Sequence, residues 1–146
     1  MHNLGQEFIK LGDKHQAIEY YEQALEVRIA PLLTRVAGEI ECKKLTELGI
    51  AYSEVARYHE AISCLNQSLQ FLKSFSYPHL NIAVYFQTIG NLLFIIGENG
   101  KATEYYKKEL DHTMRALSPQ DDGIIARSLS NLGKSYFGLR TIYRVD

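Results

Sequence analysis

One short pattern occurs four times in this chain of 146 residues, and it limits the possible folds more than any other feature. The pattern is an aliphatic residue, then Gly, then a large apolar residue three positions later: Leu4-Gly5-x-x-Phe8, Leu48-Gly49-x-x-Tyr52, Ile89-Gly90-x-x-Leu93 and Leu132-Gly133-x-x-Tyr136. The first three copies are followed by an Ala 12 residues after the Gly, at Ala17, Ala61 and Ala102. A fixed distance that recurs in this way indicates an internal repeat.

The periodicity inside each copy is helical. In the second copy, apolar residues recur at spacings of three and four over residues 45–55 and again over residues 61–72, as in two amphipathic helices. Helix breakers separate the two halves of a copy, for example at Gly12-Asp13 and at residues 97–100. No segment alternates with a period of two. The sequence therefore predicts an all-α chain of helical hairpins.

The recurrent glycines indicate how closely the helices of a hairpin pack. Gly5, Gly49, Gly90 and Gly133 each cost up to about 1 kcal/mol of helix propensity relative to Ala. A Gly at the same place on every apolar face suggests that the partner helix packs against bare backbone. The alanines of the second helix fit such a close crossing.

These elements resemble the tetratricopeptide repeat (TPR), in which Leu-Gly-x-x-Tyr is followed by Ala-x-x-x-Tyr. The aliphatic anchors here are 41 to 44 residues apart, which is similar to the longer units of kinesin light chain and of Pins-type polarity adaptors. The resemblance implies a right-handed α-α superhelix, or solenoid, of stacked helical hairpins with about three and a half units. We expect one domain over residues 1–146, with repeats over residues 2–30, 31–75, 77–116 and an incomplete 118–146.

The last repeat has a first helix but no Ala-x-x-x-Tyr half after it. Its apolar residues Leu129, Leu132 and Tyr136 would then lack the helix that normally covers them. We expect either that residues 139–145 fold back over these side chains or that two chains meet there, because exposed apolar faces are usually hidden. Self-association into a homodimer or larger assembly through this repeat is the alternative function.

Composition excludes several other classes of protein. The formal net charge of −1 gives no long-range attraction to nucleic acid or to an anionic membrane. Two cysteines are too few for a disulfide scaffold, and the segment from Met1 to Gly5 lacks the apolar run of a signal peptide, so we expect a cytoplasmic protein.

Catalytic and metal-binding patterns are not evident in the sequence either. The five histidines, which include His79 and His112, show no pair four residues apart on one helix, and no Cys, Asp or Glu ligands converge with them. No nucleophile has a neighbouring base in sequence. We therefore expect no metal, no cofactor and no enzymatic activity.

In the family that this chain resembles, the first helix of each repeat lines a concave groove that holds a peptide of the partner. The matching positions, opposite the predicted core face, are Lys43, Glu47, Ile50, Glu54, Gln87, Asn91, Phe94, Arg127, Asn131, Lys134 and Phe137. The two phenylalanines are large apolar groups that face away from the core. Asparagine is a poor helix former, and its amide can both donate to and accept from a peptide backbone.

The charges of these groove positions differ along the chain. Glu47 and Glu54 lie in the second repeat, whereas Arg127 and Lys134 lie in the fourth. We therefore expect a protein or peptide partner whose acidic residues lie toward the C-terminal repeats, with an apolar side chain near Phe94. The Lys and Asn clamp with which chaperone-binding relatives hold a C-terminal carboxylate is missing, so a heat-shock chaperone tail is not the expected ligand.

Overall fold

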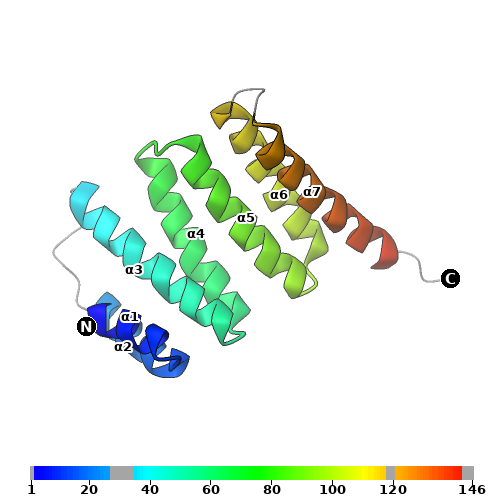
Figure 1. Ribbon diagram of the computed structural model, residues 1–146. Helices are drawn as coiled ribbons and strands as arrows, with labels where there is room; N and C mark the ends of the chain where they lie inside the picture. Colours follow the sequence, from blue (N-terminus) through cyan, green and yellow to red (C-terminus); the bar gives the residue numbers. More distant parts are fainter. Residues whose placement is uncertain (1, 27–34, 118–120, 143–146) are drawn as a thin grey trace. The chain divides into compact units, whose positions relative to one another are not determined.

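The computed structural model describes residues 2–26, 35–117 and 121–142, and they form helices joined by turns (Figure 1). The helices of these residues are α1 (His2–Lys10), α2 (Lys14–Glu26), α3 (Arg35–Glu54), α4 (Tyr58–Ser74), α5 (His79–Ile95), α6 (Asn99–Ala116) and α7 (Asp122–Ile142). No strand occurs in the described ranges, and the predicted all-α class is confirmed.

The chain divides into two compact units. Residues 1–71 contain α1 to α3 and most of α4, and residues 72–146 contain α5 to α7. The predicted repeat boundaries near residues 30 and 118 lie outside the described residues, so these bounds stay predictions.

Each hairpin ends its first helix with one residue in the left-handed region of backbone conformation. These residues are Gly12 (φ +80°), Ala56 (φ +61°) and Gly97 (φ +84°). In the first hairpin, the amide of Asp13 donates to the carbonyl of Phe8 at 2.9 Å, and the other two hairpins repeat this bond at the same length. This is the Schellman arrangement, which satisfies carbonyls at the end of a helix and reverses the chain.

The same turn also begins the second helix. The carbonyl of the residue after the left-handed position accepts the amide of the recurrent alanine, at 3.1 Å for Ala17, 3.0 Å for Ala61 and 2.9 Å for Ala102. All three alanines are completely buried. The constant spacing of 12 residues therefore covers the part of the first helix that follows the Gly, the turn of fixed geometry, and the start of the second helix at the Ala.

The predicted close crossing of the two helices is present in all three hairpins. A Cβ atom at Gly5 or Gly90 would lie 2.8 Å from the ring of Tyr21 or Tyr106, respectively. At Gly49 it would lie 3.1 Å from the Cγ atom of Leu65. Any side chain at these glycines would push the second helix away.

The first unit contains a further close approach that the repeat pattern does not show. A Cβ atom at Gly38, on α3, would lie 2.1 Å from the ring of Phe71, on α4. Polar contacts join α2 to α3: the buried Lys44 ammonium donates to the carbonyl of Ala24 at 3.0 Å, near the C-terminus of α2. A cation at that end of a helix is favoured by the helix dipole.

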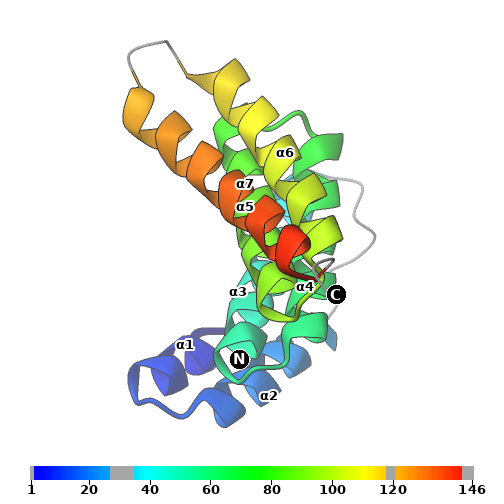
Figure 2. The ribbon, with the colours of Figure 1, turned by 90° about the vertical axis from the view of Figure 1, so that its right-hand side faces the viewer.

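In the second unit, α6 and α7 lie side by side (Figure 2), and buried polar side chains join these two helices. Ser128 and Ser135 of α7 are completely buried against α6. The hydroxyl of Thr103 donates to Ser135 at 2.9 Å, and the hydroxyl of Ser128 donates to the buried carboxyl of Glu109. Burial raises the pKa of this carboxyl, although the Ser128 hydrogen bond and the Arg127 charge oppose the shift.

The structure corrects the expectation of a tail that folds back. Residues 139–142 continue α7 to Ile142 and do not reverse direction, and residues 143–146 lie outside the described residues. Leu129 and Tyr136 remain 52% and 47% exposed, while Leu132 is half-buried. The predicted apolar face of α7 therefore lacks a covering segment within the described residues, because α6 packs on a different side of the helix.

The hairpin crossing leads to a prediction about stability. We expect Gly49→Leu to lower the free energy of unfolding by about 1–3 kcal/mol, because the new side chain must displace Leu65 and the backbone of Ala61. The matched control is Gly100→Leu, where a Cβ atom meets nothing within 4 Å. Urea unfolding followed by circular dichroism measures both variants, and equal stability of the two would contradict the close crossing.

A second prediction concerns the turn at Ala56. An L-residue in the left-handed region costs about 1–2 kcal/mol, and Gly loses about 0.5–1 kcal/mol more entropy on folding. We therefore expect Ala56→Gly to stabilise the protein by about 0.5–1 kcal/mol in the same unfolding experiment. Ala126→Gly, at an exposed position inside α7, should instead destabilise it by about 1 kcal/mol. A loss of stability in both variants would show that position 56 is not strained.

Candidate functional site

The predicted groove residues of the second repeat lie along α3, in the first unit. Lys43, Ile50 and Glu54 are exposed and Glu47 is half-buried. The side-chain amide of Gln6, on α1, donates to Glu47 at 3.0 Å. This carboxylate therefore joins α1 to α3 as well as facing the predicted site.

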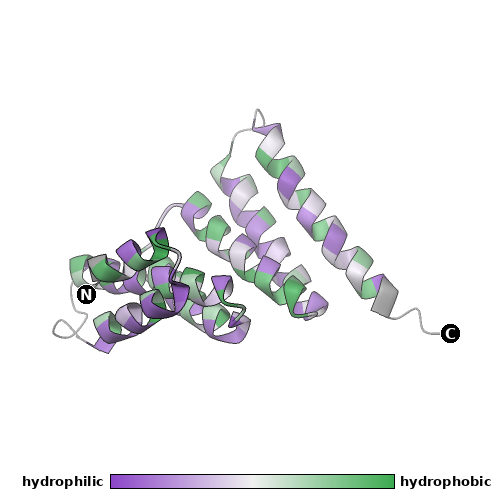
Figure 3. Cartoon of the chain, turned by 60° about the horizontal axis from the view of Figure 1, so that its bottom comes forward, coloured by the Kyte–Doolittle hydropathy of each residue, from purple (hydrophilic) through white to green (hydrophobic). Residues whose placement is uncertain are grey.

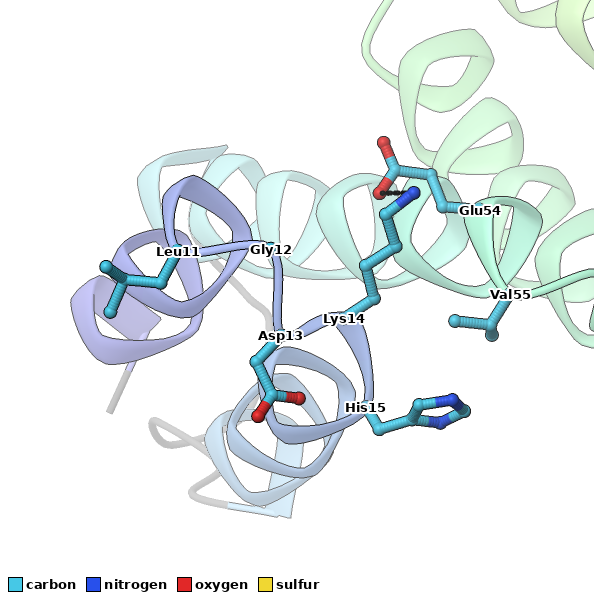
Figure 4. A pocket seen from close by; sticks show the side chains of 7 residues that line it. All are labelled: Leu11, Gly12, Asp13, Lys14, His15, Glu54 and Val55. Carbon is cyan, nitrogen blue, oxygen red and sulfur yellow. Dashed lines mark ion pairs between the residues drawn. The ribbon is translucent and has the colours of Figure 1, made fainter.

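A pocket of about 540 Å³ lies beside these residues, where the turn between α1 and α2 meets the end of α3 (Figure 4). Its lining residues are Leu11, Gly12, Asp13, Lys14, His15, Glu54 and Val55. Lys14 and Glu54 form an ion pair at 3.7 Å across it, and the Asp13 carboxylate accepts the amide of Gln16 at the start of α2. The charged groups thus have structural partners, and the pocket shows no nucleophile paired with a base.

The remaining predicted residues lie in the second unit. Gln87, Asn91 and Phe94 are on α5, and Arg127, Asn131, Lys134 and Phe137 are on α7. The two helices approach each other near their C-terminal ends, because a Cβ atom at Gly138 would lie 3.3 Å from the Phe94 ring. The structure therefore brings the α5 and α7 residues onto neighbouring helices.

We define the α5–α7 face as the exposed residues Val84, Asn91, Phe94, Ile95, Lys134 and Phe137. Its apolar members are well exposed, from 38% for Phe94 to 70% for Phe137. Phe94 is the member shown to lie against the other helix, beside Gly138 of α7. Exposed apolar side chains that adjoin one another are typical of interaction sites.

A hydrogen bond from α6 orients the side chain of Asn91. The hydroxyl of Tyr106, on α6, donates to the carboxamide oxygen of Asn91 at 2.6 Å. Burial, followed by the nearby charge of Glu109, raises the pKa of Tyr106 to about 12, so the hydroxyl keeps its proton and remains a donor at neutral pH. The bond fixes the amide oxygen and leaves the NH₂ end of Asn91 as the part that faces away from Tyr106.

Arg127 has a second role that the sequence did not reveal. Its positive charge lowers the pKa of the buried Glu109 carboxyl, against the larger effect of burial. Because a carboxylate at the exposed position 127 would lie near the buried carboxyl of Glu109, Arg127→Glu is a poor test of ligand binding. Lys134, which is also exposed on α7, is the better position for a charge reversal.

The structure also brings together two histidines that are 33 residues apart. His79 lies at the start of α5 and His112 lies on α6, and their Nδ1 atoms are 2.8 Å apart. The His112 ring stacks on the Phe86 ring, with 5.4 Å between the ring centroids. The spacing of the histidines within single helices does not indicate this pair, because it joins two helices. Within the described ranges, no group of three or more His, Cys, Asp or Glu side chains could hold a metal ion.

Comparison with known proteins agrees with this fold. A family model described as "Tetratricopeptide repeat" matches residues 1–28. Among solved structures, BtubC (BKLC) from P. vanneervenii has a TM-score of 0.74 at 16% identity, over 94% of this chain and 54% of that chain. The nearly identical TPR-like repeats of a Podosopora anserina protein assigned as a kinesin light chain have a TM-score of 0.72 at 16% identity, over 97% and 66%. None of the curated proteins matches this sequence.

A third solved structure is the TPR2AB domain of yeast Sti1 in complex with pHSP90. It has a TM-score of 0.66 at 23% identity, over 97% of this chain and 47% of that chain. The chain thus spans about half to two thirds of the length of these three structures. The likenesses show the fold of a helical-repeat solenoid, and the predicted resemblance to TPR proteins with kinesin-light-chain-like repeats is confirmed.

None of the helices in the described residues is long and apolar enough to cross a bilayer.

The histidine pair leads to a prediction about pH. Burial, followed by the charge of His79, lowers the pKa of His112; Arg115 and Lys73 act in the same direction, and Asp111 opposes them. The fold therefore favours neutral His112, and this stabilisation is present above the unfolded pKa of about 6.5 and is lost as the pH falls below it.

We expect the melting temperature to fall between about pH 7 and pH 5, and His112→Gln to remove part of this fall. His59→Gln, at an exposed position on α4, is the matched control and should leave the pH dependence as in the parent. Identical pH profiles for the parent and His112→Gln would contradict the proposed effect of the pair.

Proposed function

We propose that this chain is a non-catalytic protein-interaction scaffold that binds a peptide segment of a partner along the α5–α7 face. The observation that carries the proposal is the exposure of Phe94 and Phe137 on two neighbouring helices, with Asn91 one turn from Phe94. Apolar anchors of this kind dominate binding energy when a partner buries them.

Backbone recognition would come from the asparagines. The hydrogen bond from Tyr106 orients Asn91 before any ligand arrives, which reduces the entropy lost on binding. Asn131 lies half-buried on α7 and would contribute a second amide. The two amides suit a ligand whose carbonyl and amide groups are accessible.

Charge would orient the ligand. Lys134 and Arg127 favour acidic residues over α7. In the first unit, the predicted contact residues of α3 are Lys43, Glu47, Ile50 and Glu54, and the two acids there favour basic residues. Electrostatic complementarity mainly affects the association rate and the orientation of the ligand, so the aromatic contacts should supply more of the affinity.

The comparisons support an interaction scaffold without naming the ligand. The yeast Sti1 structure of the same fold is a complex with pHSP90, so this fold can hold a protein partner in that case. The chaperone clamp is missing from this sequence, and we propose a different peptide for this chain. A cytoplasmic location is part of the proposal, and it is supported by the two buried free cysteines, Cys42 and Cys64.

The test starts with a random-peptide display library screened against the purified chain, and calorimetry then measures the selected peptides. We expect Phe94→Ala to weaken binding by about 2 kcal/mol or more and Asn91→Ala by about 1–3 kcal/mol. Lys134→Glu should weaken the binding of acidic peptides, most strongly at low salt, and should reduce the dependence of their affinity on salt concentration.

The matched control is Lys101→Glu, an exposed charge reversal on α6, which should bind like the parent. Circular dichroism checks that each variant is folded. If all three variants of the α5–α7 face bind like the parent, the ligand lies elsewhere on the molecule.

A further inference from the structure

Two imidazole rings meet at the open end of the hairpin that α5 and α6 form. His79 is the first residue of α5 and His112 lies one turn before the end of α6, so the pair lies at the end of the hairpin opposite its turn. The two Nδ1 atoms are 2.8 Å apart, and the ring centroids are 5.0 Å apart. His79 is exposed and His112 is half-buried, so the pair is accessible from solvent.

Neighbouring residues hold both rings in position. The His112 ring stacks on the buried Phe86 ring, with an angle of 28° between the ring planes. The carbonyl of Pro78 accepts the amides of Asn81 and Ile82 at 3.0 and 3.3 Å, which fixes the backbone at the start of α5. Figure 3 shows hydrophilic and hydrophobic residues on the same helices, as expected where a polar pair borders an apolar contact. The fold therefore sets the separation of the two nitrogens.

Two neutral imidazole nitrogens at this separation suit a transition-metal ion. A Zn²⁺–N bond is about 2.0–2.1 Å long, so two nitrogens on one zinc are roughly 3.3 Å apart at a tetrahedral angle and roughly 2.9 Å apart at a right angle. The observed 2.8 Å needs to widen by no more than about half an ångström. We propose that His79 and His112 form a two-imidazole site that binds Zn²⁺ or a similar divalent transition-metal ion through both Nδ1 atoms.

Water would fill the other coordination positions of the ion. Within the described residues, no third His, Cys, Asp or Glu joins the pair to make a group that could hold a metal. The site is therefore open, and we expect weaker binding than at a structural zinc site with four protein ligands. The sequence predicted no metal, because no two histidines lie four residues apart on one helix, but a pair that joins two helices is not subject to that spacing.

The charges around the pair determine how its binding depends on pH. Burial lowers the pKa of His112, followed by the charge of His79; Arg115 and Lys73 act in the same direction, and Asp111 opposes them. Arg115 forms an ion pair with Asp111 at 3.2 Å, which compensates part of its charge beside a bound dication. Because the ligand must be neutral imidazole, binding is strongest where both rings are neutral, and protons displace the ion at lower pH.

An ion at this site would close the hairpin at its open end. The turn at residues 96–98 joins α5 to α6, and the ion would join them again through two residues that are 33 positions apart. Because the unfolded chain does not hold the two rings together, Zn²⁺ should raise the melting temperature of the parent but not of His79→Gln. The proposal does not rest on peptide binding, since neither histidine belongs to the α5–α7 face.

Calorimetric titration of the full, untagged chain with Zn²⁺ at about pH 7.5 tests the proposal. We expect one ion per chain, with an affinity lowered by about tenfold or more in either His79→Gln or His112→Gln. His59→Gln, at an exposed position on α4, is the matched control and should bind like the parent. Mg²⁺, which prefers oxygen ligands, should not bind. At about pH 5 the affinity of the parent for Zn²⁺ should also be lower by about tenfold or more.

The coordinating atoms are identified by the ¹⁵N chemical shifts of the imidazole nitrogens. Zn²⁺ should shift the Nδ1 resonances of His79 and His112 and leave those of His59 unchanged. Circular dichroism checks that each variant is folded, and His79→Gln removes one ligand at an exposed position. A parent that binds Zn²⁺ no more tightly than His79→Gln, or Zn²⁺-dependent shifts that do not include this pair, would overturn the proposal.

Discussion

The close approach of two helices at a glycine is the interaction on which the rest of this structure depends. Tyr21 and Tyr106 lie so near to the backbone of Gly5 and Gly90 that no Cβ atom fits between them. Such a crossing requires a turn that reverses the chain at a fixed distance from the glycine, and the left-handed residue of each hairpin provides it. It also requires a small residue early in the second helix, which explains why the recurrent alanines are completely buried. The first helix then keeps its opposite side exposed, and the proposed peptide site lies on that side.

Helix α7 carries the Leu-Gly-x-x-Tyr pattern of the first helix of a hairpin, but no second helix follows it within the described residues. Its contact with α6 includes the buried Ser128 and Ser135, which bond to Glu109 and Thr103, and Lys107 of α6 lies over the ring of Tyr136. Buried hydroxyl groups are stable here because each has a hydrogen-bond partner. Among the described residues, no atom lies within 4 Å of a Cβ atom placed at Gly133, and Phe137 lies one turn from this glycine.

The hairpins could be predicted from the sequence because spacing alone determines them: a Gly at the crossing and an Ala 12 residues later leave few alternatives. The left-handed conformation of Ala56 could not be predicted, since nothing in an alanine indicates a positive φ. The Gly38–Phe71 contact and the His79–His112 pair each join positions 33 residues apart on different helices, which no local pattern reveals. Exposure of the eleven candidate groove positions followed from helical periodicity, and all eleven are exposed or half-buried. The hydrogen bond from Tyr106 to Asn91 and the effect of Arg127 on Glu109 depend on side-chain packing and needed the structure.

The central claim is that the exposed side of the first helices, and not the second helices, receives the ligand. Nuclear magnetic resonance of the ¹⁵N-labelled chain, titrated with a peptide selected from the display library, tests this claim most directly. The account predicts that the largest shifts occur at the backbone amides of α5 and α7 around Asn91, Phe94 and Lys134 and at the side-chain amide of Asn91, while the exposed amides of α6 stay in place. Shifts concentrated on the exposed side of α6, with Asn91 and Phe94 unaffected, would contradict it.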